Sequence, residues 1–219
     1  MRRLPVYLLL DQSSSMLGEP IEAVNNGAQL FVSTLRQDPY ALETVHISII
    51  GFADKATRLV PLTELASFQL PSIAARGMTS LGAALTLLAE SIETDLQKTT
   101  ADAKGDWKPL VFILTDGRPT DDWRVGLERL KKVRTGMIVA CLAGQDADPE
   151  TDRDVAEVLL AITPSVLKLD TADSNAIKAF FKWVTASVAT GSQKVDAGQK
   201  EVMGLADLPP PPAEVNVVI

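Results

Sequence analysis

The chain has 219 residues and 46% of them are hydrophobic, which is typical of one globular domain with a sizeable core. With 28 acidic and 21 basic side chains, its net charge of −7 argues against a nucleic-acid-binding surface. The single cysteine, Cys141, excludes an intrachain disulfide and favours a reduced, intracellular compartment, where it serves as a small buried hydrophobe.

The N-terminus has some features of a secretory signal, because Arg2 and Arg3 precede an apolar stretch. That stretch is interrupted by Pro5, ends at Asp11 and has no cleavage site. It is also too short to span a membrane, and no other run of the chain reaches the necessary length. We therefore expect a soluble, cytoplasmic protein with no membrane contact.

Residues 6–10 form an apolar run of the kind found in buried parallel strands. The run ends in Asp11-x-Ser13-x-Ser15, at the edge of an α/β sheet where ligands bind. Asp and Ser also cap helices, and a helix is predicted to begin near residue 19. As metal ligands, these hard oxygen atoms would suit Mg²⁺, Mn²⁺ or Ca²⁺ but not zinc.

A helix with regularly spaced apolar residues follows and is expected to stop before Asp38-Pro39. Residues 44–52 are rich in β-branched side chains and predict a strand, and residues 56–60 predict a returning strand, so the pair would form a hairpin at a sheet edge. The only histidine, His46, lies in the first of these strands. Without a second histidine or a cysteine partner, it indicates a structural residue.

Residues 61–76 are expected to form a loop before a helix over 80–98. Thr79 follows Gly77 just before this helix and has two interpretations. It is a good N-cap after a glycine turn, and it would also present a third hydroxyl beside the first site. The two roles are compatible.

A polar surface loop over 99–108 leads into a second apolar strand, residues 109–115, which ends in Asp116. A turn follows, and Thr120 or Asp121 is expected to cap a helix that runs to about residue 134. Two parallel neighbouring strands that both end in Asp would bring two carboxylates together. Like charges held that close need a counterion, and a divalent cation is the simplest one.

The rest of the chain alternates in the same way, with strands predicted at 137–143 and 166–169 and helices at 149–161 and 174–189. The alternation predicts a doubly wound, mostly parallel α/β sheet. We place the domain at residues 1–189 and a proline-containing tail at 190–219.

The tail is small and polar at first, with helical character near residues 199–205. A polyproline run follows over 209–212, and residues 214–219 partly alternate. The end of the chain is therefore either a frayed tail or a strand that adds to a sheet edge, its own or a partner's.

Three motifs occur in this order at two strand ends and one helix start: Asp11-x-Ser13-x-Ser15, Gly77-x-Thr79-x-Leu81 and Thr115-Asp116-Gly117. Together they resemble the von Willebrand factor A (VWA) domain with its metal-ion-dependent adhesion site (MIDAS). Further stretches are similar to the TerY group of bacterial tellurium-resistance and stress gene clusters. These are MRRLPVY (1–7), PYALETV (39–45), KGDWKP (104–109) and the proline-rich ending.

The resemblance implies a three-layer, Rossmann-like fold whose edge strand, residues 56–60, is antiparallel. It also implies one divalent cation, usually Mg²⁺. Ser13 and Ser15 would bind it directly, Thr79 directly or through water, and Asp11 and Asp116 largely through water. A carboxylate from a partner protein would complete the coordination. The family often has a second glycine where this chain has Met78, which leaves every oxygen ligand in place.

These observations favour a metal-dependent protein-binding module rather than an enzyme. The TerY resemblance suggests a serine/threonine kinase, a PP2C-type phosphatase and Ter-cluster proteins as partners. Two alternatives stay open. A metal-dependent hydrolase would need a general base that the sequence does not place near the site. A scaffold whose metal site is only structural would carry the same motifs, so the sequence does not exclude it.

Overall fold

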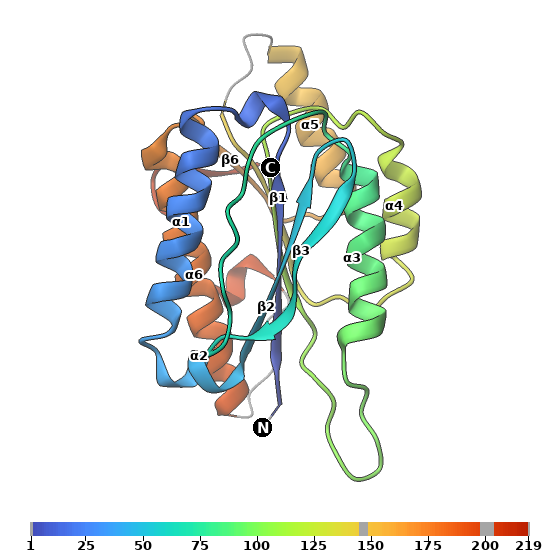
Figure 1. The fold of residues 1–219 in the computed structure, drawn as a ribbon, viewed down its shortest axis with the longest axis vertical. Helices are drawn as coiled ribbons and strands as arrows, with labels where there is room; N and C mark the ends of the chain where they lie inside the picture. Colours follow the sequence, from blue (N-terminus) through green and yellow to red (C-terminus); the bar gives the residue numbers. More distant parts are fainter. Residues whose placement is uncertain (1, 145–148, 198–203, 219) are drawn as a thin grey trace.

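The computed structural model of the chain describes residues 2–144, 149–197 and 204–218. Within these residues one sheet of seven strands, in the order β3-β2-β1-β4-β5-β6-β7, has helices on both faces (Figure 1). This confirms the predicted α/β, doubly wound and mostly parallel architecture. The strands are β1 (Leu4–Asp11), β2 (Val45–Phe52), β3 (Ala56–Glu64), β4 (Leu110–Thr115), β5 (Ile138–Leu142), β6 (Val166–Leu169) and β7 (Val215–Val218).

The five central strands are parallel, and an antiparallel strand lies at each edge. The predicted hairpin is confirmed, because β3 pairs antiparallel with β2, and it continues to Glu64 rather than ending at residue 60. At the other edge β7 pairs antiparallel with β6. Both outer positions of the sheet are therefore filled by strands that do not need a crossover helix.

Two groups of helices complete the three layers, one on each face of the sheet (Figure 1). The first face is covered by α1 (Glu19–Leu35), α2 (Pro39–Thr44) and α6 (Ser174–Asp196). The second is covered by α3 (Leu81–Asp95), α4 (Trp123–Leu130) and α5 (Pro149–Ile162). Short 3₁₀ turns occur at η1 (Ser14–Met16) and η2 (Leu205–Asp207).

Helices α2 and α6 depart most from the prediction, while α3 and α4 end three and about four residues earlier than expected. The short helix α2 begins at Pro39, which the sequence had marked only as the end of the preceding helix. Proline is favoured in a first helical turn, and the Asp38 carboxylate caps α2 by accepting from the backbone N–H groups of Tyr40 and Ala41. Helix α6 continues beyond residue 189 to Asp196. The expected helical character near 199–205 lies almost entirely outside the described residues.

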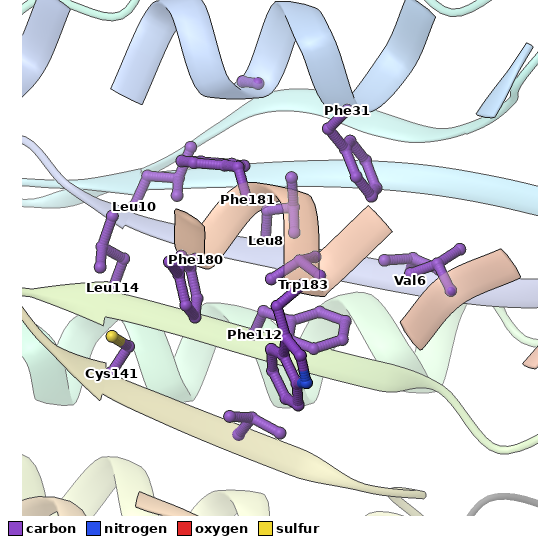
Figure 2. Close-up of a cluster of buried hydrophobic side chains, with 14 of the residues drawn as sticks. Val6, Leu8, Leu10, Phe31, Phe112, Leu114, Cys141, Phe180, Phe181 and Trp183 are labelled. Carbon is purple, nitrogen blue, oxygen red and sulfur yellow. The ribbon is translucent and has the colours of Figure 1, made fainter. Parts of the chain in front are cut away.

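Successive side chains of a strand belong to apolar clusters on opposite faces of the sheet, as β1 illustrates. Val6, Leu8 and Leu10 belong to the apolar cluster beneath α1 and α6, whereas Tyr7 and Leu9 belong to the cluster beneath α3 and α4. Figure 2 shows the first cluster, with aromatic side chains from β4 and α6 gathered around β1. Since both faces of β1 are covered, the strand is apolar almost to its end and its first carboxylate marks the edge of the core.

The C-terminal segment packs on the sheet's own edge. Val215 is paired with Leu169 and is 4% exposed, and Leu208 is also buried. The indole Nε1 of Trp183 on α6 donates to the carbonyl of Pro209 over 2.8 Å. The segment is thus held by a strand pairing, a hydrogen bond and apolar burial.

This packing predicts different costs for two substitutions on the same short strand. Val215→Asp puts a charge into an apolar site and should destabilise the protein by about 3 kcal/mol. Val217→Asp is the matched control, because Val217 is 45% exposed, and should stay within about 0.5 kcal/mol of wild type. Denaturant unfolding of both variants measures the difference, and equal midpoints would mean that β7 is not docked.

Candidate metal centre

The structure brings the five residues of the predicted site to one edge of the sheet. Asp11 ends β1 and Asp116 follows β4, and the parallel register that pairs Leu10 with Leu114 puts these two strand ends side by side. Thr79 lies just before α3, in a loop that reaches the same edge. Three separate segments therefore contribute polar side chains to one place.

Asp11 is the most buried of the five, with 1% of its surface exposed. Its Oδ2 accepts a hydrogen bond from Thr115 Oγ1 at 2.5 Å, and its Oδ1 accepts one from the backbone N–H of Ser13 at 2.7 Å. The first bond joins β1 to β4, and the second folds the chain back immediately after β1. Both oxygens are thus fixed, and Asp11 orients the loop that carries the serines.

Ser13, Ser15 and Asp116 form a chain of hydrogen bonds. Ser15 Oγ donates to Asp116 Oδ1 at 2.8 Å, and the Ser13 and Ser15 hydroxyl oxygens are 2.9 Å apart. Since the Ser15 proton points to Asp116, Ser15 accepts in its bond with Ser13. Three oxygen atoms from two loops therefore lie in one chain of contacts, with Ser15 in the middle.

Thr79 presents its hydroxyl to the same space. A methyl group added at Gly117 would lie 3.8 Å from Thr79 Oγ1 and 3.9 Å from Ser15 Oγ. Both hydroxyls therefore lie beside Gly117, and a side chain at that position would fill the space next to them. The hydrogen at residue 117 leaves this space open.

Backbone hydrogen bonds connect the three loops. The N–H of Ser14 donates to the carbonyl of Gly77 at 2.9 Å. Thr79 and Thr120 bond reciprocally, the N–H of Thr79 donating to Thr120 Oγ1 and the N–H of Thr120 donating to the carbonyl of Thr79. The first pair ties the serine loop to the threonine loop, and the second ties the threonine loop to the loop after β4.

Two further carboxylates, Asp54 and Asp121, position the site in a role that the sequence pattern did not indicate. Asp54 follows β2 and accepts from the N–H of Met78, beside Gly77 whose φ of +74° favours glycine. Asp121 accepts from the N–H groups of Gly82 and Ala83 at the start of α3. Their positions in the sequence were the only signal for this role, since each follows a strand that ends at this edge.

The caps of the two helices differ from those expected. Thr79 is not the N-cap of α3, because Ser80 occupies that position without a side-chain cap bond. Asp121 satisfies the exposed N–H groups of α3 from another loop. Helix α4 is capped by Asp122, which accepts from Arg124 N–H, rather than by Thr120 or Asp121. The Thr79 side chain is therefore not used by the helix.

The electrostatics favour a cation. Burial raises the pKa of Asp11 to about 6, and the neighbouring Asp116 carboxylate contributes in the same direction, while hydrogen bonds from Thr115 and Ser13 oppose the shift. The ionised form of Asp11 is thus costly without a positive partner. A divalent cation at this edge would remove that cost.

The donor set also fits such an ion. Ligand oxygens at adjacent positions of an octahedral Mg²⁺ ion lie about 2.9 Å apart, given metal–oxygen distances of about 2.0–2.1 Å. The Ser13 and Ser15 oxygens have this separation. Among the described residues no group of three or more His, Cys, Asp or Glu side chains could hold a metal, so a site built from those ligands alone does not compete with this one.

His46 lies at the opposite end of β2, where its Nδ1 contacts the carbonyl of Thr44 at 3.2 Å. It is therefore far from the strand ends that carry the carboxylates. In the described part of the chain, no helix is both long and apolar enough to cross a membrane.

Residues 6–179 match the family described as the von Willebrand factor type A domain. No curated protein matches the chain. Among solved structures, the pilus adhesin SpaC from Lactobacillus rhamnosus GG is similar, with a TM-score of 0.67 at 16% identity. The alignment covers 87% of this chain and 30% of the adhesin, so the chain spans less than a third of that protein.

Two other solved structures have the same fold. The PilB minor pilin from Streptococcus sanguinis aligns with a TM-score of 0.61 at 10% identity, over 84% of this chain and 60% of the pilin. A von Willebrand factor type A protein from Catenulispora acidiphila aligns with a TM-score of 0.59 at 16% identity, over 86% of this chain and 43% of that one. At these identities the likeness concerns the fold.

The raised pKa of Asp11 predicts how the metal-free protein responds to pH. Its carboxyl ionises near its ordinary value of 3.8 in the unfolded chain and near 6 in the folded chain, so ionisation opposes folding. In EDTA, the stability of wild type relative to Asp11→Asn should be greatest below pH 3.8 and fall as pH rises from there to about 6. Thermal unfolding at several pH values tests this, and a difference that does not vary with pH would contradict it.

Proposed function

The chain belongs to the von Willebrand factor type A domain family, and from this premise we propose that it is a divalent-metal-dependent protein-binding module with a MIDAS-type site. Ser13 and Ser15 bind Mg²⁺ directly and Thr79 binds directly or through water. Asp11 and Asp116 act largely through bound water. Mn²⁺ and Ca²⁺ are the other ions that such oxygen ligands suit.

One observation carries the proposal: the Ser13, Ser15 and Asp116 oxygens meet in one chain of contacts, with the Thr79 hydroxyl beside them. The direct ligands are neutral hydroxyls, so they leave most of the ion's charge uncompensated. An Asp or Glu side chain of a partner protein would then gain a strong bond with demanding geometry. Recognition of an acidic residue is thus the chemistry this site favours.

Binding is better supported than hydrolysis. The site offers its carboxylates and hydroxyls as ligands, and the single histidine lies at the other end of β2. The similar structures include proteins named as a pilus adhesin and a minor pilin, and protein adhesion is the corresponding role that we propose for this chain.

We place the module in the setting that its resemblance to the TerY group implies. Its partners would be a serine/threonine kinase, a PP2C-type phosphatase or Ter-cluster proteins in a tellurium-resistance or stress pathway of the cytoplasm. The motif stretches at residues 1–7, 39–45 and 104–109 support this setting.

Apolar side chains border the site and extend the surface that a partner would meet. Leu17 and Met78 are 60% and 57% exposed, and they lie on the two loops joined by the Ser14–Gly77 hydrogen bond. Exposed side chains of this size beside a charged centre fit a partner whose acidic residue has an apolar neighbour.

Metal dependence is tested with wild type, Asp11→Ala and Asp102→Ala, each with excess Mg²⁺ and with EDTA. Wild type and Asp102→Ala, an exposed residue of the loop before β4, should gain about 3 kcal/mol of stability at a hundredfold excess of Mg²⁺ over its Kd. Asp11→Ala should gain none. Denaturant unfolding measures these gains, and pull-down from native lysate with the same samples measures partner capture. Capture of the same partner in all samples would refute metal-dependent recruitment.

Thr79→Ala separates an adhesion site from a structural one. The adhesion role predicts that Thr79→Ala abolishes partner capture in Mg²⁺ while the metal-free protein keeps its melting temperature. A purely structural metal site predicts the reverse: Thr79→Ala keeps partner capture but lowers the melting temperature.

The apolar border has its own test. Met78→Ser should weaken binding of the captured partner by about 1 kcal/mol, near fivefold in Kd, while Mg²⁺ still raises the melting temperature as in wild type. Leu160→Ser, on α5, is the control because Leu160 is also partly exposed, at 39%. Equal partner affinities for the two variants would show that Met78 is outside the contact.

A further inference from the structure

A second concave site lies at the other end of the molecule, where the parallel strands begin. It is a cavity of about 520 Å³ between the end of α3, the loop that leads into β4, and the segment after α4. In Figure 1 this loop projects from the end of the fold opposite to η1. The cavity is separated from the candidate metal centre by the length of β4.

The cavity is basic although the chain as a whole is acidic. Five basic side chains line it: Arg2, Lys98, Lys108, Lys132 and Arg134. They come from three separate parts of the sequence, which the fold gathers at one place. A chain with a net charge of −7 thus concentrates about a quarter of its 21 basic residues around one cavity.

The two carboxylates in the lining form their hydrogen-bonded ion pairs with arginines that lie outside the cavity lining. Glu93 accepts two hydrogen bonds from Arg129, at 2.9 and 2.5 Å. Asp106 accepts two from Arg3, at 2.9 and 2.5 Å. The positive charge of Lys98, Lys132 and Arg134 therefore exceeds the negative charge that the lining contributes.

Trp107 provides an independent observation. It lines the cavity with 2% of its surface exposed, and its buried indole Nε1 has no hydrogen-bond partner among the described residues. That nitrogen is buried from the cavity as well as from solvent, so the indole contributes its ring rather than a donor to the wall. The guanidinium of Arg2 lies 5.1 Å from the centre of the same indole ring.

The remaining wall is apolar and includes Ile92, Leu96 and Val133. A volume of 520 Å³ falls within the range of roughly 300–1,000 Å³ that small-molecule sites have. The cavity therefore combines clustered cations and an apolar wall in a space of cofactor size. An inorganic anion would use only the cations.

We propose that this basic cavity binds a nucleoside polyphosphate. The phosphates lie against Lys98, Lys132 and Arg134, because lysine and arginine are the side chains that bind phosphate as point charges and as planar forks, respectively. The base and sugar lie against the apolar wall. This site is independent of the proposed metal-dependent function.

The test is calorimetric titration of the intact chain with ATP, tripolyphosphate and adenosine in EDTA, so that the metal centre contributes nothing. ATP should bind saturably, tripolyphosphate more weakly, and adenosine not measurably. The double variant Lys132→Glu/Arg134→Glu should lose at least about tenfold in ATP affinity. The double variant Lys178→Glu/Lys182→Glu, on the exposed face of α6, makes the same change in net charge and should bind as wild type.

Absence of ATP binding to wild type, or equal ATP affinity in the two double variants, would overturn the proposal. Binding of a poly-glutamate peptide as tight as that of ATP would also overturn it, because the cavity would then be a protein-docking surface.

Discussion

The hydrogen bond from Thr115 to Asp11 is the constraint on which the candidate metal centre depends. It joins residues 104 positions apart in the sequence, and it exists only because β1 and β4 are parallel neighbours in a fixed register. A shift of one residue between these strands would turn the Asp11 side chain to the other face of the sheet. The core that fixes this register therefore also fixes the site.

Carboxylates outside the proposed ligand set hold the loops in place. Asp54 fixes the backbone of the threonine loop, and Asp121 caps α3 from a loop that follows a different strand. Each of these bonds satisfies N–H groups that the secondary structure leaves unpaired. The loops are thus preorganised by the same interactions that terminate the helices, and the hydroxyls need no helix-capping role.

Much of the fold was predictable because its signals are local. Apolar runs that end at Asp11 and Asp116 gave both the strands and the strand ends, and the spacing of apolar residues gave the long helices. The extra helix α2 was missed because Pro39 is compatible with both the end of one helix and the first turn of the next. Capping of α3 by Asp121 and the basic cavity were not predictable, since each joins segments that meet only after the chain has folded.

The order of the strands also governs when the candidate metal centre can form during synthesis. Asp11 ends β1 and Asp116 follows β4, and these two strands are neighbours in the middle of the sheet. Yet β4 is made about half a chain later than β1. While the ribosome makes the intervening segments, the nascent chain holds Asp11 and the serines without their counterparts. An ion that needed all three loops would therefore bind only after β1 and β4 have paired, so its binding would distinguish chains that contain this pair from shorter ones.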